Sequence, residues 1–222
     1  MSGRGQGALD LSADRARALA LTHVSRETLA RLDAYVAVLL RWQSKLNLVA
    51  PSTLPHLWIR HIADSLQLIP LAPQARVWVD LGSGGGFPGL PIACALADTT
   101  GTKVHLVESN GKKTAFLREA VRLVGLQAEV HQQRAENFGE SWSGTADVVT
   151  ARALAPLKTL CDQAFPLMAK GAVGLFPKGQ DVGAELTEAS KYWTIEASRV
   201  PSRTSPDGCI VVISGLKPRQ RG

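Results

Sequence analysis

Cysteine is scarce in this 222-residue sequence, and long hydrophobic runs are missing from it. The three cysteines, Cys94, Cys161 and Cys209, are far apart and never form a C-x-x-C pair. This spacing predicts neither a disulfide framework nor a zinc site. The histidines show no metal-ligand spacing either, so no metal is expected.

The N-terminal region lacks the continuous apolar segment of a signal peptide, because Arg15 and Arg17 interrupt it. No stretch approaches the roughly 18 apolar residues that a membrane span needs. Unpaired cysteines favour a reducing compartment. We therefore expect a cytoplasmic protein that has no membrane partner.

Acidic residues are outnumbered in this chain. The 25 Lys and Arg residues stand against 19 Asp and Glu, which gives a formal net charge of +6 and a sequence pI of about 9.5. A positive field favours polyanions such as nucleic acid, but it also keeps many proteins soluble, so both interpretations stay open. The length suits one globular domain with a helical appendage.

Helical patterns occupy the N-terminal third. Residues 1–9 are rich in glycine, and we expect them to be flexible. Ser25 is the expected N-cap of one long amphipathic helix over residues 26–48, because apolar residues recur there at spacings of three and four. A second helical pattern covers residues 57–69. Residues 10–73 are therefore predicted to form a helical extension packed on the core.

The pattern then changes to short apolar runs that are separated by helical segments. These runs predict seven strands, at residues 76–82, 103–108, 128–133, 146–152, 172–178, 194–200 and 209–214. Strands that alternate with helices specify right-handed βαβ units, and the short link between the last two strands predicts an antiparallel hairpin. The predicted fold is α/β, with a doubly wound, mostly parallel seven-stranded sheet over residues 74–216 and a basic tail at 217–222.

The segment DLGSGGGFPGLPIA, residues 80–93, joins the first strand to a helix through a glycine-rich loop that lets the backbone approach a ligand. In one register, Gly84, Gly86 and Gly89 match G-x-G-x-x-G, so a nicotinamide-dependent oxidoreductase is one hypothesis. Asp80, however, would repel a pyrophosphate and attract the ammonium group of S-adenosylmethionine. The loop therefore favours S-adenosylmethionine as the cofactor.

Other candidate residues follow the neighbouring strands at the same edge of the sheet. Glu108 ends the second strand, where doubly wound nucleotide sites place a carboxylate for the ribose hydroxyls. The segment 134–136 follows the third strand, where an adenine could be held, and Arg152 follows the fourth. In the alternative interpretation, Asp80 and Glu108 only cap helices and the arginines form surface ion pairs.

Four blocks of the sequence, VDLGSGGGFPGLPIA, HLVESNGKKTAFLREA, RAE and TARALAPL, resemble the glucose-inhibited division protein B family. The resemblance extends from about residue 47 to residue 179. Members of that family are guanine-N7 methyltransferases of bacterial small-subunit ribosomal RNA. The resemblance implies a class I methyltransferase fold, S-adenosylmethionine as the cofactor and 16S ribosomal RNA or the small ribosomal subunit as the partner. We expect a monomer.

The cofactor-binding residues come from two sources. Carried over by motif, the family's contacts fall on Gly82, Phe87, Ala135, Glu136 and Arg152. The physical argument adds Asp80, Gly84 and Glu108.

Methylation at guanine N7 leaves few catalytic signatures in a sequence. N7 has a lone pair and carries no proton, so it can attack a sulfonium methyl group without a general base, and no catalytic residue is predicted. Signatures of other methylations are missing, because no cysteine follows a proline and N/D-P-P-Y does not occur. We interpret the cysteines as small apolar core residues.

Two features stay open to a functional or a structural interpretation. His61 lies in a polar turn that could bind substrate, or in which Asp64 could simply pair with Arg60. The helix after Glu108 has a basic face that could bind phosphates or merely be solvated. This face consists of Lys112, Lys113, Arg118 and Arg122. A third functional hypothesis is a non-enzymatic RNA-binding assembly factor that keeps the fold.

Overall fold

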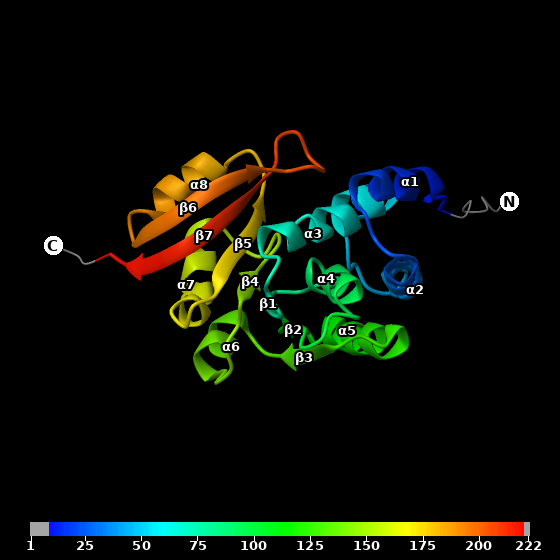
Figure 1. Ribbon diagram of the computed structural model, residues 1–222, viewed down its shortest axis with the longest axis horizontal. Helices are drawn as coiled ribbons and strands as arrows, with labels where there is room; N and C mark the ends of the chain where they lie inside the picture. Colours follow the sequence, from blue (N-terminus) through cyan, green and yellow to red (C-terminus); the bar gives the residue numbers. More distant parts are fainter. Residues whose placement is uncertain (1–8, 220–222) are drawn as a thin grey trace, which may run out of the picture.

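The computed structural model describes residues 9–219, which fold around one seven-stranded sheet with helices on both faces (Figure 1). Residues 1–8 of the expected flexible segment and residues 220–222 of the expected basic tail lie outside the described residues. Within residues 9–219, no helix is long and apolar enough to cross a membrane.

Two α-helices and a series of short helical turns precede the sheet. Their bounds are α1 Ser12–Leu21, α2 Arg26–Gln43, η1 Pro51–His56, η2 Trp58–Ala63, α3 Asp64–Leu66 and η3 Ile69–Leu71. Ser25 caps α2 as predicted, because its hydroxyl oxygen accepts a hydrogen bond from Thr28 N (3.1 Å). The sequence did not predict α1, whose apolar residues are mostly alanines and give a weak periodic pattern.

The helix predicted over residues 26–48 ends early, at Gln43. The Gln43 side chain turns the chain at this point. Its Oε1 accepts hydrogen bonds from Leu48 N (3.0 Å) and Val49 N (3.1 Å), and its Nε2 donates to Val49 O (2.9 Å). The Gln43 side chain thus provides hydrogen-bond partners for backbone groups of Leu48 and Val49, so these groups do not need a further helical turn.

The helix predicted over residues 57–69 is divided into several pieces. A π-helical segment, η2, is followed directly by the short α3. The carboxylate of Asp14, in α1, accepts a hydrogen bond from Trp58 N (2.7 Å) at the start of η2. This contact fixes the start of η2 against α1.

All seven predicted strands are present. They are β1 Val77–Leu81, β2 Lys103–Glu108, β3 Ala128–Gln132, β4 Val148–Thr150, β5 Val173–Lys178, β6 Trp193–Pro201 and β7 Cys209–Pro218. Their spatial order is β3-β2-β1-β4-β5-β7-β6, and only the pairs made by β7 are antiparallel. The predicted doubly wound sheet with a terminal hairpin is confirmed, although β7 continues past residue 216 into the expected tail.

The crossover helices divide between the two faces of the sheet (Figure 1). They are α4 Gly89–Ala95, α5 Gly111–Val124, α6 Ala135–Ser141, α7 Leu157–Met168 and α8 Val182–Ala189. One apolar core joins α4, α5 and the N-terminal helices to the sheet, and the other joins α6, α7 and α8. The division into a helical extension, 10–73, and a sheet domain, 74–216, stays a prediction.

The sequence predicts that the helix after Glu108 begins with Asn110 as its N-cap and ends with Gly125 as its C-cap, and both ends of α5 are as predicted. The side chain of Asn110 accepts hydrogen bonds from Lys112 N (3.0 Å) and Lys113 N (3.2 Å) at the N-terminus. Gly125 takes the left-handed conformation at the C-terminus, with a φ of +73°. The chain order reverses between β1 and β4, so the carboxyl ends of these strands form the topological switch point where doubly wound folds bind ligands.

Candidate active site

The glycine loop between β1 and α4 lies at this carboxyl edge. Gly82 has a φ of +69°, and a Cβ atom there would lie only 2.5 Å from Cδ1 of Leu154, in the loop after β4. Gly89 begins α4, and a Cβ atom there would lie 2.3 Å from Cδ2 of Leu106 on β2. Glycine at these positions lets the loop and α4 pack directly on the strands.

Asp80 lies beneath the glycine loop and is only 1% exposed. Its Oδ2 accepts a hydrogen bond from Gly89 N (3.1 Å) at the start of α4, and its Oδ1 has no hydrogen-bond partner among residues 9–219. Burial raises the pKa of the Asp80 carboxyl to about 7. The hydrogen bond from Gly89 N agrees with the alternative interpretation, in which Asp80 caps a helix. A role of Asp80 as a cofactor ligand stays a prediction.

Glu108 joins the glycine loop to the start of α5. Its Oε2 accepts a hydrogen bond from Gly84 N (2.9 Å), and its Oε1 accepts one from Asn110 N (2.7 Å). The carboxylate thus holds the backbone on both sides. Each oxygen keeps a second lone pair, which leaves Glu108 able to accept a further hydrogen bond from a ligand.

A cavity of about 410 Å³ opens above the ends of β1, β2 and β3. Its volume lies within the range of small-molecule sites. Five of the eight predicted cofactor-binding residues line it, namely Gly82, Gly84, Glu108, Ala135 and Glu136. The other lining residues are Val107, Ser109, Lys113, Gln133, Arg134, Ala153, Leu154 and Gln163. Asp80, Phe87 and Arg152 do not line this cavity.

Gln163, on α7, is a lining residue that sequence reasoning missed. Its Nε2 donates a hydrogen bond to Oε1 of Glu136 (2.8 Å), while its own Oε1 is buried without a partner among the described residues. The sequence held a signal, because Gln163 lies three residues after Leu160 and four before Leu167, on the apolar side of the helix. An unpaired polar atom at such a place indicates a ligand contact.

Phe87 faces the N-terminal helices instead of this cavity. Its ring centroid lies 4.8 Å from that of His61 and 5.5 Å from that of Tyr35. The guanidinium carbon of Arg152 lies 6.0 Å from the Phe87 ring. Phe87 therefore holds the glycine loop against η2 and α2, and its predicted contact with a cofactor stays untested.

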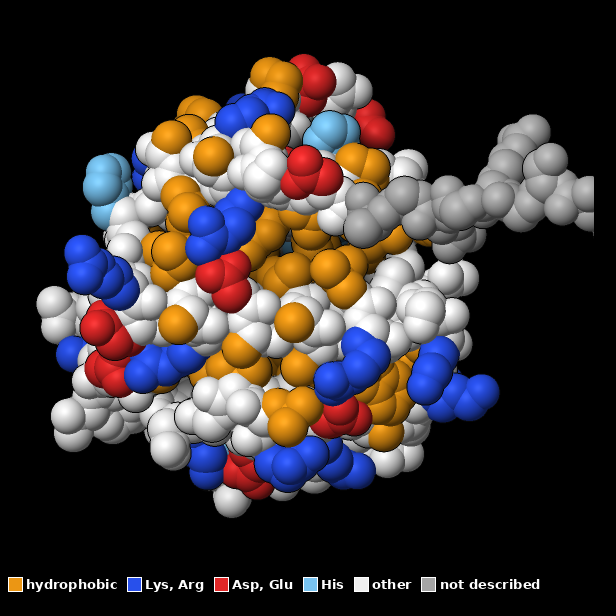
Figure 2. Space-filling model, turned by 90° about the vertical axis from the view of Figure 1, so that its right-hand side faces the viewer, with side chains coloured by type: hydrophobic (Ala, Val, Ile, Leu, Met, Phe, Trp, Pro, Cys, Tyr) orange, Lys and Arg blue, Asp and Glu red, His pale blue; other side chains and the backbone are white. Residues whose placement is uncertain are grey.

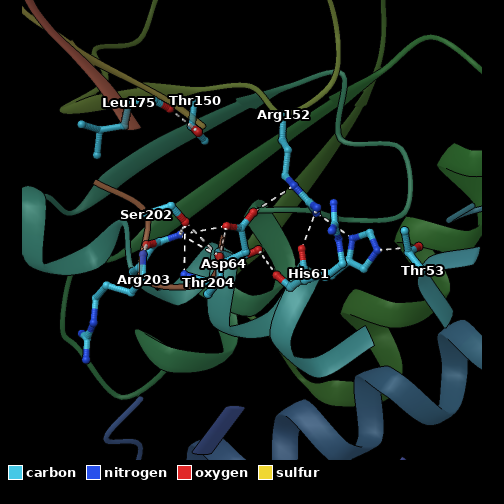
Figure 3. Close-up of polar contacts among 12 residues, drawn as sticks. Thr53, His61, Asp64, Thr150, Arg152, Leu175, Ser202, Arg203 and Thr204 are labelled. Atoms are coloured by element: carbon cyan, nitrogen blue, oxygen red, sulfur yellow. Dashed lines mark hydrogen bonds and ion pairs between the residues drawn. The ribbon is translucent and has the colours of Figure 1, made fainter. Parts of the chain in front are cut away.

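Arg152 reaches from the end of β4 to the helical turns before the sheet (Figure 3). Its Nη1 contacts His61 Nδ1 (2.6 Å), its Nη2 donates to Arg60 O (2.6 Å), and its Nε lies 3.1 Å from Asp64 Oδ2. The expected pair between Asp64 and Arg60 is not formed, because Asp64 pairs with Arg152. The side chain thus connects segments that are far apart in the sequence.

The contact with Arg152 fixes the tautomer of His61. An arginine can only donate, so Nδ1 of His61 accepts and Nε2 carries the proton, which it donates to Thr53 Oγ1 (2.9 Å). Burial, followed by the charges of Arg152 and Arg60, lowers the pKa of His61 to about 3. His61 is therefore a neutral, fully hydrogen-bonded side chain and is not available as a general base.

A second cavity, of about 330 Å³, lies above β4 and β5. Its walls come from η2 and α3, from the ends of β4 and β5, and from the turn between β6 and β7. Ala153 lines both cavities and has a φ of +51°, which a residue with a side chain rarely adopts. The two cavities are therefore neighbours across the loop that follows β4.

Comparison with known proteins shows the family to which the chain belongs. A family profile described as "rRNA small subunit methyltransferase G" matches residues 28–207. A protein named "Ribosomal RNA small subunit methyltransferase G" from Bradyrhizobium sp. strain ORS 278 is 61% identical over 210 residues, which cover 95% of each chain. The chain belongs to the ribosomal RNA small subunit methyltransferase G family. The protein of the same name from Bradyrhizobium sp. strain BTAi1 is 63% identical over 93% of each chain.

Solved structures agree with the class I methyltransferase fold. A methyltransferase from Podospora anserina superposes with a TM-score of 0.62 over 95% of this chain and 98% of that chain, at 15% identity. At such low identity the likeness concerns the fold alone. For this member of the methyltransferase G family, it confirms the predicted architecture.

The basic residues of this methyltransferase G family member do not form one continuous patch on the face of α1 and α2. Figure 2 shows Lys and Arg side chains there with Asp or Glu beside many of them. Arg31 pairs with Asp98 (2.7 Å), and Arg41 pairs with Glu119 (2.5 Å). Ion pairs of this kind partly neutralise the charge that could attract RNA.

Two of the histidines lie together across neighbouring strands, with His105 Nδ1 3.0 Å from His131 Nε2, and the expectation of no metal stays a prediction. His105, on β2, and Glu129 and His131, on β3, place their ligand atoms within 4.8 Å of one another, although their spacing in the sequence gave no metal-ligand pattern. Glu129 also pairs with Lys103 (2.7 Å). Since neighbouring strands bring these residues together, sequence spacing could not reveal the cluster.

The cysteines show no sign of nucleophilic reactivity. Cys94 and Cys161 are buried, and burial raises the pKa of each thiol to about 12. Cys209 is partly buried, and burial raises its pKa as well. A thiol with a raised pKa stays protonated at neutral pH, which agrees with the interpretation of these residues as apolar packing groups.

Proposed function

We propose that this protein transfers a methyl group from S-adenosylmethionine to N7 of a guanine in 16S ribosomal RNA, within the small ribosomal subunit or its RNA. We further propose that it acts as a monomer in the cytoplasm, where ribosomal subunits are assembled. One observation carries the proposal: a cavity at the carboxyl edge of this family's sheet combines the glycine loop, two carboxylates and an unpaired amide oxygen.

The residues of the first cavity fit the parts of S-adenosylmethionine. The unpaired Oε1 of Gln163 can accept a hydrogen bond from the adenine amine, and Glu108 can accept hydrogen bonds from the ribose hydroxyls. Gly82 and Gly84 present backbone without a side chain, which leaves room for the methionine part. The Asp80 carboxyl lies just below the loop, and an ammonium group placed there would favour its charged form.

The reaction needs positioning more than proton transfer. When bound, S-adenosylmethionine supplies an electrophilic methyl group on a sulfonium. The chain must then hold the guanine so that its N7 lone pair is in line with the bond that breaks. No proton has to be removed, which agrees with a neutral, hydrogen-bonded His61 and with protonated cysteines close to the sheet.

Nicotinamide-dependent oxidation is the second candidate, and one observation favours it. Gly89 packs on β2 as the third glycine of a dinucleotide fingerprint does, so the loop geometry alone suits both cofactors. Family membership supports the methyl donor instead. A non-enzymatic assembly factor would need no cofactor cavity, and the unpaired Gln163 oxygen argues against that hypothesis.

A transfer assay tests the proposal. Tritiated S-adenosylmethionine is incubated with small subunits that lack the modification, and in parallel with naked 16S RNA, and the labelled nucleoside is identified after digestion. We expect 7-methylguanosine. Label in another nucleoside, or no transfer to either RNA, would reject the proposed reaction.

Cofactor binding is tested with matched variants on α6. Glu136 lines the cavity, whereas Glu140 is exposed on the same helix and does not line it. Calorimetry should show that Glu136→Gln weakens binding of S-adenosylmethionine, and that Glu140→Gln binds as the wild type does. Tight binding of NAD without binding of S-adenosylmethionine would support the oxidoreductase instead.

A further inference from the structure

The second cavity is lined by a carboxylate, that of Glu185, of which only one oxygen has hydrogen-bond partners in the protein. Oε2 of Glu185, on α8, accepts hydrogen bonds from Leu157 N (2.6 Å) and from Nζ of Lys178 (2.7 Å). The Lys178 ammonium also donates to Ala155 O (2.9 Å). Oε1 of Glu185 has no hydrogen-bond partner among residues 9–219. One carboxylate oxygen in the wall of the cavity is therefore available to a ligand.

The other carboxylate of this cavity is already in use. Oδ1 of Asp64 accepts hydrogen bonds from Thr204 Oγ1 (2.6 Å) and Gln67 Nε2 (2.8 Å), and its Oδ2 pairs with Arg152. Figure 3 shows these side chains meeting between α3 and the turn that connects β6 to β7. Asp64 therefore holds the wall together and is not an open acceptor.

Arg60 provides the cation that remains. Its side chain is exposed and lines the cavity, and it makes no hydrogen bond or ion pair within the part of the chain that the structure describes. Lys178 and Arg152, by contrast, are bound to carboxylates. The cavity thus offers a carboxylate oxygen in its wall and a free guanidinium at an exposed position.

These groups select the chemistry of the ligand. Oε1 of Glu185 can only accept hydrogen bonds, so it suits a group that donates them and does not suit a phosphate oxygen, which also accepts. Guanine carries two adjacent donors, N1–H and the exocyclic N2 amine, on the edge opposite N7. A carboxylate oxygen that accepts from this edge leaves N7 free to face another direction.

The location agrees with this choice. Ala153 lines both cavities, so a base in the second cavity lies beside a cofactor in the first, with only the loop after β4 between their walls. We propose that the second cavity binds the target guanine: Oε1 of Glu185 accepts from the N2 amine of the base, and Arg60 contacts a flanking phosphate. This inference rests on the proposed methyl transfer to RNA.

Two pairs of variants test it on the intact enzyme with unmodified small subunits. In Glu185→Gln, the amide oxygen can keep the bond from Leu157 N while the NH2 group faces the cavity and cannot accept. Its control is Glu188→Gln, on the same helix, where the carboxylate pairs with Lys191 at the surface. Arg60→Gln has Arg203→Gln as its control, because Arg203 is exposed nearby and its side chain points away from this network (Figure 3).

We expect Glu185→Gln to lower kcat/KM for subunits by about tenfold or more, because a bond to a charged acceptor is lost. Arg60→Gln should raise KM for subunits and reduce the salt dependence of binding by about one phosphate contact. Both controls should behave as the wild type does. All four variants should bind S-adenosylhomocysteine within about twofold of wild type, since the altered side chains lie outside the first cavity.

A change in the substrate identifies the contact. Subunits are reconstituted with inosine, which lacks the N2 amine, at the position that the wild type methylates. The wild type should be less active on these subunits than on normal ones. The activity of Glu185→Gln, already low on normal subunits, should not fall further with inosine. An equal inosine penalty in both proteins, or variants that match their controls, would overturn the inference. If the wild type transfers no methyl group to normal subunits, the proposed function itself fails, and that outcome is separate.

Discussion

The guanidinium of Arg152 donates a hydrogen bond to Nδ1 of His61, 2.6 Å away, and so joins the end of β4 to a segment that precedes the whole sheet. The same side chain contacts Asp64, and Asp64 contacts Thr204 in the turn between β6 and β7. Three distant parts of the chain thus meet at one half-buried cation. This cluster forms one wall of the second cavity.

Replacement of Arg152 should therefore reduce stability more than cofactor affinity. Arg152→Met leaves the Asp64 carboxylate without its cation, and we expect a loss of about 3–5 kcal/mol in the free energy of unfolding. Denaturant unfolding measures this loss. The double variant with Asp64→Asn should cost less than the sum of the single changes. Weaker binding of S-adenosylmethionine with unchanged stability would contradict this assignment and restore Arg152 as a cofactor ligand.

The histidines predict a loss of stability on acidification. Burial lowers the folded-state pKa of His61 to about 3 and that of His105 to about 4, while both titrate near pH 6.5 when unfolded. The unfolded state then binds more protons between these limits. Their contribution to stability is complete above about pH 6.5 and is lost as the pH falls, by up to about 1.4 kcal/mol per unit for each histidine. Asp80, whose pKa is raised, acts in the opposite direction.

The variant His61→Gln isolates one of these groups. Glutamine can accept from Arg152 and donate to Thr53 as the histidine does, but it does not titrate. Unfolding measured at pH 7 and at pH 5 should show a smaller loss for the variant than for the wild type. Parallel losses would mean that His61 is protonated in the folded protein.

Alanine substitutions at Gly82 and Gly101 distinguish the effect of backbone strain from that of steric clash. Both have positive φ, but a Cβ atom at Gly82 would meet Leu154, whereas one at Gly101 would meet nothing within 4 Å. Gly101→Ala should cost about 1–2 kcal/mol of stability through strain alone. Gly82→Ala should cost more and should also weaken binding of S-adenosylmethionine in calorimetry. Equal costs and unchanged binding would show that Leu154 moves away freely.

Gln163 offers a test in which stability and affinity diverge. Gln163→Leu removes a buried oxygen that has no partner in the described structure, together with one hydrogen bond to the exposed Glu136, so the stability of the free protein should change little. The same change removes the acceptor for the adenine amine. Affinity for S-adenosylmethionine should fall by about 1–3 kcal/mol. A parallel loss of stability and affinity would indicate a purely structural role for the side chain.

The sequence predicted the sheet well because its signals are local. Short apolar runs separated by helical segments predicted all seven strands, and a link too short for a crossover predicted the final hairpin. Asn110 and Gly125 marked the ends of α5. The N-terminal helices were predicted less well, because Gln43 ends α2 through contacts with its own following loop, and the alanine-rich α1 gives little periodicity.

The candidate site was predicted in part for a related reason. Strand ends identify which residues lie at the carboxyl edge, and Glu108 and Gly84 do line the first cavity. The position of a residue at a strand end does not determine where its side chain points. Arg152 turns toward His61 and Asp64, which lie far away in the sequence, and Asp80 turns under the loop toward α4. Long-range pairing of this kind has no local signature.

The most direct test is a crystal structure of the protein with S-adenosylhomocysteine. The ligand should occupy the cavity lined by Gly82, Glu108 and Glu136, with its adenine amine within hydrogen-bond distance of Gln163 Oε1. Its sulfur should lie on the side of Ala153, facing the second cavity. A ligand bound elsewhere, or a first cavity that remains empty at saturating concentration, would contradict the account.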